Sequence, residues 1–136
     1  MGHKGNLAAF SPAGAVVGHC FLVADGAGSA ELAIFVHQEF RRRGVGTALV
    51  RAALEWGAVA GLRRVWTLTS SDNKAALRMQ EKCGFRLTNA AFPETELEID
   101  LPVRSQSKVV RQSAIKLIPP NEGCEGCFSL TTKTGT

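Results

Sequence analysis

The chain has 136 residues, of which 45% are hydrophobic and 21% charged, and its formal net charge is +4. This length fits one domain with its own core, and no apolar run approaches the ~18 residues that a membrane-spanning helix requires. The first residues lack the apolar stretch of a secretory signal. We therefore expect a cytoplasmic protein with reduced cysteines and no membrane partner.

The basic charge lies mostly towards the end of the chain. Residues 1–100 carry 11 Lys or Arg against 10 Asp or Glu, whereas residues 101–136 carry 5 against 2. A nucleic-acid-binding domain concentrates basic charge on a folded face, so the nearly neutral body argues against a nucleic-acid partner. The alternative is a salt-dependent contact made by the basic end of the chain alone.

The first part of the chain predicts three strands in a meander. Residues 6–11 form a short apolar segment that ends in a Ser-Pro-Ala-Gly turn, and residues 15–24 are apolar and β-branched up to an Asp-Gly turn. A third apolar run, from about Glu31 to Val36, has the length of a buried strand.

A basic turn with two glycines, RRRGVG at residues 41–46, follows the third strand. From Thr47 on, apolar residues recur at helical spacing, which predicts a helix over residues 44–59. The free N–H groups of a first helical turn and the helix dipole favour an anion, and glycine allows a close approach of the backbone. The turn therefore predicts a phosphate site.

The second part of the chain predicts one more helix between strands, with Ser71-Asp72 as its N-cap. The element order is then βββ-α-β-α-ββ, a mixed α/β domain over residues 1–102 with helices on a central sheet. The predicted elements are a strand at 64–70, a helix at 73–82, and strands at 85–90 and 95–101.

The remaining residues, 103–136, are rich in Gly, Ser and Thr and predict a mostly flexible basic tail. Cys124 and Cys127 form a lone CxxC within it. A zinc site needs four ligands, and a single CxxC supplies half of that set. We therefore expect no metal.

Two motifs at the predicted separation resemble the GNAT superfamily of acyl-CoA-dependent N-acetyltransferases. Residues 41–46 match its Q/R-x-x-G-x-G/A signature between a strand and a helix. Asn73, Ala76-Leu77 and residues 81–85 (EKCGF) resemble its N-x-x-A-x-x-x-Y-x-K-x-G-F block. The resemblance implies a mostly antiparallel central sheet with a splayed central strand and flanking helices.

The resemblance also implies acetyl-CoA as co-substrate. In this superfamily the central strand pairs with the pantetheine arm, often where a bulge splays the strand, and the glycine turn binds the pyrophosphate. An asparagine at the position of Asn73 contacts the lower part of the arm. The implied cofactor-binding residues are Ile34, Phe35, Val36, Arg41, Arg42, Arg43, Gly44, Val45, Gly46, Thr47 and Asn73.

The implied reaction is the transfer of an acetyl group to a primary amine, on a protein or a small molecule, by direct attack in a ternary complex. The amine must be neutral, so a base has to take its proton. Glu31 opens the central strand, where it resembles the general base of the protein-lysine acetyltransferases in this superfamily. The alternative for Glu31 is a surface glutamate at a strand end.

Two positions depart from the family pattern. Gln80 stands where the family usually has a tyrosine acid, Leu68 stands at another common base position, and the chain contains no tyrosine. These departures keep a second hypothesis open, a module that binds acyl-CoA without catalysis. The chain also begins at what resembles the family's second strand, which implies either an open acceptor site or a homodimer that completes it.

Overall fold

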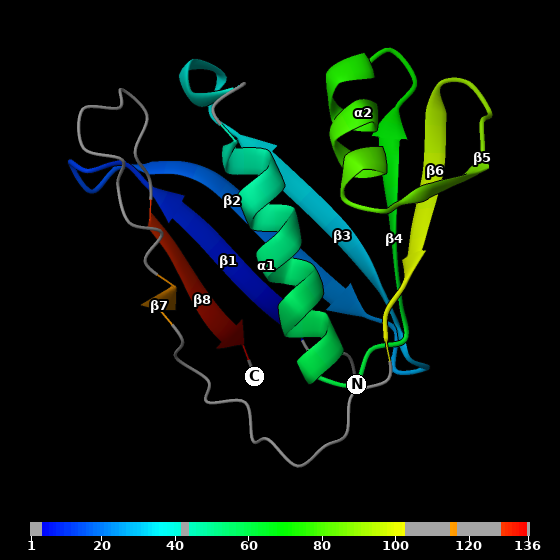
Figure 1. Cartoon of the computed structure of the whole chain (residues 1–136), viewed down its shortest axis with the longest axis horizontal. Helices are drawn as coiled ribbons and strands as arrows, with labels where there is room; N and C mark the ends of the chain where they lie inside the picture. Colours follow the sequence, from blue (N-terminus) through cyan, green and yellow to red (C-terminus); the bar gives the residue numbers. More distant parts are fainter. Residues whose placement is uncertain (1–3, 42–43, 103–114, 117–128, 136) are drawn as a thin grey trace.

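A computed structural model of the chain describes residues 4–41, 44–102, 115–116 and 129–135 (Figure 1). No helix in this part of the chain is long and apolar enough to cross a membrane. The elements, in chain order, are β1 (Lys4–Phe10), β2 (Val16–Ala24), β3 (Ser29–Val36), the short 3₁₀ helix η1 (Gln38–Phe40), α1 (Val45–Val59), β4 (Arg64–Ser70), α2 (Lys74–Lys82), β5 (Arg86–Asn89), β6 (Glu94–Asp100), β7 (Ile115–Lys116) and β8 (Ser129–Gly135).

The predicted order βββ-α-β-α-ββ is confirmed from β1 to β6. One detail of the prediction is wrong, because α2 is capped by Asn73 and not by Ser71-Asp72. The Oδ1 atom of Asn73 accepts a hydrogen bond from the backbone N of Ala76 at 3.1 Å. Asparagine is among the strongest N-cap residues, and only the structure shows which of several neighbouring candidates takes the position.

All the strands join one sheet in the order β5-β6-β4-β3-β2-β1-β8-β7. Neighbouring strands are antiparallel except β3 and β4, which are parallel. Both helices lie on the same face of the sheet, with α1 across β1, β2 and β3 and α2 beside β4 (Figure 1). The mostly antiparallel α/β sheet predicted from the sequence is therefore confirmed.

Two strands lie in the part of the chain for which the sequence predicted a flexible tail. β8 pairs with β1 along its whole length, from Lys4–Gly135 to Phe10–Ser129, and β7 pairs with β8. An open edge presents unpaired N–H and C=O groups, and the Thr-rich sequence of β8 favours an extended strand. The CxxC of the tail lies outside the described residues, and the domain boundary near residue 102 stays a prediction.

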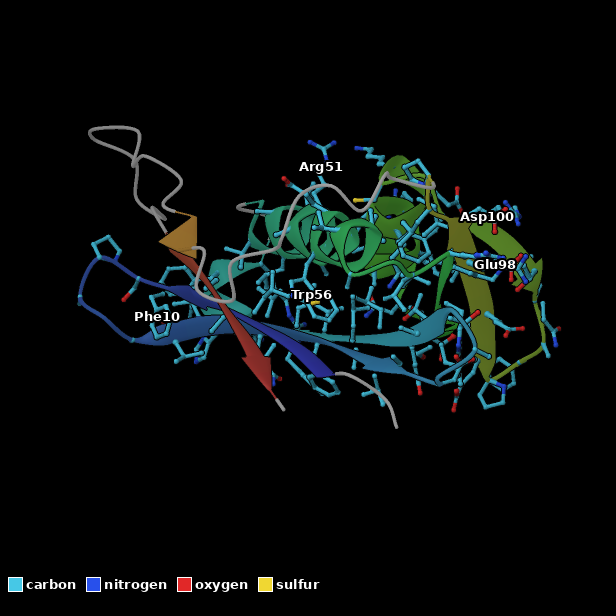
Figure 2. The ribbon with its side chains drawn as sticks, turned by 90° about the horizontal axis from the view of Figure 1, so that it is seen from below. Phe10, Arg51, Trp56, Glu98 and Asp100 are labelled. Carbon is cyan, nitrogen blue, oxygen red and sulfur yellow. The ribbon has the colours of Figure 1, made fainter. Side chains whose placement is uncertain are left out.

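The core lies between α1 and the sheet. Trp56 points from α1 towards the sheet (Figure 2) and covers Gly5 of β1, where a Cβ atom would lie 2.8 Å from the indole ring. Only glycine therefore permits this approach, and the contact fixes α1 on the sheet. The fully buried side chains of the core include Leu7, Leu22, Leu32, Leu49, Val50, Val65 and Leu97.

Candidate acetyl-CoA site

The two parallel strands β3 and β4 form a fork. They pair at three positions, the last of which joins Glu31 to Trp66. Beyond it they separate (Figure 1), although β3 remains paired with β2 as far as Val36. At the apex the hydroxyl of Thr67 donates to the carbonyl oxygen of Leu32 at 3.0 Å. The splayed central strand expected from the sequence is confirmed.

The free edge of β3 presents backbone hydrogen-bonding groups to the fork. The N–H and C=O of one strand residue point to the same edge, and the direction alternates along the strand. The carbonyl of Leu32 faces β4, whereas the N–H of His37 donates to Val17 of β2 at 2.7 Å. By this alternation the N–H and C=O groups of Ile34 and Val36 face the fork, where they have no partner among the described residues.

The N-terminus of α1 offers a second set of free donors. Its N-cap is Gly44 at φ +80°, which has no side chain to accept from the helix, and the first turn contains no acidic residue. The first bond of the helix joins the N–H of Ala48 to the carbonyl of Gly44 at 3.0 Å. The N–H groups of Val45, Gly46 and Thr47 are therefore left for an anion.

A cleft of about 610 Å³ connects the helix N-terminus with the free edge of β3. This volume lies in the range of pockets that enclose small-molecule ligands. The cleft is lined by Ile34, Phe35, Val36, Phe40, Arg41, Gly44, Gly46, Thr47, Asn73, Ala75, Ala76 and Met79.

The cleft brings together eight of the eleven residues that the sequence predicted to bind the cofactor: Ile34, Phe35, Val36, Arg41, Gly44, Gly46, Thr47 and Asn73. Of the other three, Val45 is 1% exposed, so only its backbone can serve the site. Arg42 and Arg43 lie outside the described residues.

Sequence reasoning missed part of the lining. Phe40 and Met79 contribute apolar surface to the cleft, together with two alanines of α2. Met79 resembles an ordinary core residue in the sequence, yet its Cε atom lies 3.4 Å from the position of a Cβ on Gly46. The spacing from Ala75 and Ala76 to Met79 places them on one face of a helix. This pattern after Asn73 is the sequence feature from which their place in the cleft lining could have been predicted.

Glu31 does not line the cleft. Its neighbours Ala30 and Leu32 are buried beneath α1, so alternation directs the half-buried Glu31 to the opposite face of the sheet. Phe35 shares that face, is 64% exposed and contacts the ring of Phe21 at 6.4 Å between centroids. The candidate base therefore lies on the face of the sheet away from α1 and outside the cleft lining, although Phe35 on the same face does line the cleft.

No metal centre stands beside the cleft in the described part of the chain. There, no group of three His, Cys, Asp or Glu side chains is placed to hold a metal ion. The two described cysteines are free, and burial raises the pKa of the Cys20 thiol to about 12. Cys20 is therefore a core residue and no nucleophile at neutral pH.

The fold and the cleft are of the GNAT type. Residues 3–85, more than half of the chain, match the model of the acetyltransferase (GNAT) family. The chain therefore belongs to this family.

Two curated relatives share its central segment. An uncharacterized N-acetyltransferase of Methanocaldococcus jannaschii is 40% identical over 52 residues, which are 38% of this chain and 23% of the relative. N-acetyltransferase family 8 member 3 of Rattus norvegicus is 39% identical over 57 residues, 42% of this chain and 25% of the relative. The matched segments thus span about a quarter of each relative.

Solved structures of GNAT proteins share the fold. A phosphinothricin acetyltransferase of Sinorhizobium meliloti in complex with AcCoA has a TM-score of 0.67 at 18% identity, over 77% of this chain and 65% of its own. A spermidine N-acetyltransferase of Vibrio cholerae in complex with CoA and spermine has a TM-score of 0.62 at 18% identity, over 71% of this chain and 65% of its own. At these identities the likeness concerns the fold alone.

Proposed function

We propose that this protein transfers an acetyl group from acetyl-CoA to a primary amine in a ternary complex. The observation that carries the proposal is one cleft that joins a helix N-terminus without a side-chain cap to an unpaired strand edge. The helix N-terminus can bind a pyrophosphate, and the strand edge can pair with a chain of amides. Acetyl-CoA contains both, and it supplies the activated thioester.

The residues of the cleft fit this co-substrate. The N–H groups of Val45, Gly46 and Thr47 would bind the pyrophosphate, with Arg41 at the rim as an exposed cation. The backbone of Ile34 and Val36 would pair with the pantetheine amides as a neighbouring strand does. The carbonyl of Asn73 caps α2, which leaves its amide NH₂ free to donate to the arm.

The acceptor amine would reach the thioester from the face of the sheet that carries Glu31. The Glu31 carboxylate would take a proton from the amine, through a water, as the nitrogen attacks the carbonyl carbon. The C–N bond forms, the C–S bond breaks, and its electron pair leaves on sulfur. A free N–H of β3 would stabilise the negative charge that develops on the carbonyl oxygen.

The solved structures with a similar fold support acetyl-CoA as the co-substrate and an amine as the acceptor, and they leave the particular amine undetermined. One was solved with AcCoA and another with CoA and spermine, a polyamine. The present chain has an apolar and acidic face beside the fork, where Phe35 and Leu68 are exposed and Glu31 is half-buried. Such a face can receive an alkylammonium group, either of a small amine or of a lysine.

The proposal is tested by incubating the full chain with acetyl-CoA and a panel of amines that includes polyamines, amino acids and lysine peptides. Thiol release reports turnover, and mass spectrometry must show one acetyl group on the amine. We expect release that depends on the amine. If acetyl-CoA binds in calorimetry and no amine is acetylated, the chain is a non-catalytic acyl-CoA module. If acetyl-CoA does not bind, the cleft is wrongly assigned.

A further inference from the structure

The face of the sheet that points away from α1 and α2 carries aromatic and acidic side chains beside the fork. In Figure 2 both helices lie on one side of the sheet, and neither covers the other side. The phenyl ring of Phe35 and the side chain of Leu68 are exposed on this open face. Large apolar side chains that gather on an exposed surface mark a binding site or an interface, so this face requires a ligand or a partner.

Ala33 is the smallest side chain in the middle of this face. On β3 it lies between Glu31 and Phe35, and on β2 it stands directly opposite Phe21. Residues two apart on a strand share a face, and the Cβ atoms of opposite residues are about 5 Å apart. Three larger side chains therefore surround the methyl group of Ala33, which is itself only half-buried. We call these four residues the Ala33 site.

Two sides of the Ala33 site are aromatic rings in contact. The ring centroids of Phe21 and Phe35 lie 6.4 Å apart, and the imidazole of His19 lies 5.4 Å from the ring of Phe21. These contacts restrict the orientation of the Phe21 ring. The face of an aromatic ring attracts a cation within about 6 Å of its centroid. The site thus combines two rings that can bind a cation with the carboxylate of Glu31.

The charges of the open face also favour a cation. Within the described chain Glu31 forms no salt bridge, whereas the guanidinium groups of Arg64 and Arg86 are paired with Glu98 and Asp100. The carboxylate of Glu31 is therefore the charge that no salt bridge balances at the Ala33 site. It attracts a positive group and repels an acidic one.

The remaining side of the Ala33 site opens towards the cofactor cleft. Beyond Glu31 the strands β3 and β4 are no longer paired, so the sheet has a gap at the level of Ala33. Phe35 belongs to both places, since it borders Ala33 and also lines the cleft. A group bound above Ala33 would therefore lie next to the free edge of β3.

We propose that the Ala33 site binds the ammonium group of the acceptor, through the rings of Phe21 and Phe35 and the carboxylate of Glu31. The inference rests on the proposed function for the identity of this cation as the acceptor. It narrows the acceptor to aliphatic amines that are protonated in solution. Amines with a carboxylate close to the nitrogen are excluded, because that group would meet Glu31. Phe21, which lies outside the cleft lining, is then a specificity-determining residue.

The site is tested without turnover by calorimetry on the full chain, first free and then saturated with CoA. The probes are choline, a quaternary ammonium ion, and its neutral analogue, in which a carbon atom replaces the charged nitrogen. The two have the same shape, so only the charge distinguishes them. We expect wild type to bind choline about tenfold more tightly than the analogue. In steady-state assays choline should compete with the amine and not with acetyl-CoA.

Matched variants separate the aromatic ring from its apolar surface. Phe21→Leu keeps an apolar side chain and removes the ring, so the affinity for choline should fall about fivefold, while the neutral analogue and acetyl-CoA bind as in wild type. Phe10→Leu is the control, because Phe10 is equally half-buried and lies on β1 four residues along from the partner of Phe21. It should lower stability and leave choline binding unchanged. Glu31→Gln should weaken choline binding as well.

The acceptor class is tested by kinetics with a diamine, a lysine peptide and a free amino acid that has only its α-amine. Acetylation of the diamine or the peptide with a kcat/KM at least tenfold above that of the amino acid supports the assignment, and shows whether a small amine or a protein supplies the ammonium. Equal kcat/KM values for all three would contradict it.

The outcomes distinguish the Ala33 site from the proposed function. Failure of acetyl-CoA to bind overturns the proposed function alone, since a choline preference that Phe21→Leu reduces would still support the cation site. Equal affinity of wild type for the two probes overturns the site, and so does an unchanged preference in Phe21→Leu or, if that variant does not fold, in Glu31→Gln. A wild-type dimer that does not bind choline and that Phe21→Leu dissociates would make the open face an interface between two copies, which also overturns the site.

Discussion

The two halves of β3 have different surroundings. Residues 30–31 are paired with β2 on one side and β4 on the other, whereas residues 32–36 are paired with β2 alone. The first half is part of the sheet, and the second half is an edge inside the molecule. Strand edges are usually protected because they bind other chains, and here an internal edge faces a cleft.

The difference follows from one hydrogen bond and two helices. At the apex the hydroxyl of Thr67 donates a hydrogen bond to the carbonyl oxygen of Leu32. The strands can therefore separate there without leaving this buried carbonyl unsatisfied. Beyond the apex α1 packs over β3 and α2 beside β4, and the side chain of Met79 meets Gly46 between them. The helices therefore hold the fork open, and the site is a consequence of the packing.

The largest effect is expected at Glu31, which ends the paired half of β3. Glu31→Gln keeps the shape and removes the base, so kcat should fall by about a hundredfold or more. Affinity for acetyl-CoA should stay within twofold of wild type, because Glu31 lies outside the cleft. Steady-state kinetics and calorimetry check both values. A kcat that does not change would show that Glu31 is a surface residue.

The unpaired half of β3 is tested by Val36→Pro. The N–H of Val36 faces the fork, so proline removes no bond to β2. We expect acetyl-CoA to bind about tenfold more weakly, since one buried donor to the ligand is lost. Val36→Ala keeps the N–H and is the control. Equal losses in both variants would mean that the side chain, and not the backbone, contributes the affinity.

The helix end of the cleft is tested by Gly44→Ala. Gly44 has φ +80° and nothing within 4 Å of a Cβ position, so the variant meets backbone strain without a steric clash. The unfolding free energy should fall by about 1 kcal/mol, and affinity for acetyl-CoA should fall with it because the N-cap sets the direction of the first N–H groups. Gly14→Ala, at φ +88° in the turn between β1 and β2 and outside the cleft lining, should cost similar stability and leave binding unchanged.

The smallest effect is expected at the closed end of the fork. Asp100 accepts hydrogen bonds from Arg86 at 2.9 Å and Arg64 at 3.1 Å, and these bonds lower its pKa. Figure 2 places Glu98 and Asp100 on β6, far from Phe10. A lowered pKa means that the ionised group stabilises the fold above the ordinary pKa of aspartate and loses this effect as the pH falls through the lowered value.

For Asp100→Asn we therefore expect a slightly lower melting temperature near neutral pH, because exposed ion pairs contribute little. The difference from wild type should vanish in acid, below the pKa of Asp100. Binding of acetyl-CoA should not change. A difference that persists in acid would mean that Asp100 acts by packing and not by charge.

The local parts of the site could be predicted from the sequence. The glycine turn at 44–46 and the start of α1 follow from residue types at fixed spacing, and β4 has the limits that its β-branched run predicts. The separation of β3 from β4 came from the family resemblance. Nothing in residues 32–36 themselves shows that one edge of the strand is free.

The remaining features depend on contacts between distant residues. The pairing of β8 with β1 joins the two ends of the chain, and no local pattern names the partner of a strand. The side of the sheet that Glu31 faces is defined only once α1 is known to cover Ala30 and Leu32. The hydrogen bond between Thr69 and Gln80 likewise joins a strand to a helix, and the sequence shows only that a tyrosine is missing.

The central claim is that β3 binds acetyl-CoA through its free edge, and residue-resolved amide hydrogen exchange tests it most directly. In the free protein the amides of Ile34 and Val36 should exchange faster than that of Phe35, which faces β2. Saturating acetyl-CoA should slow Ile34, Val36 and the first turn of α1 by at least tenfold and change Phe35 least. Unchanged exchange at Ile34 and Val36 in the bound protein would contradict the claim.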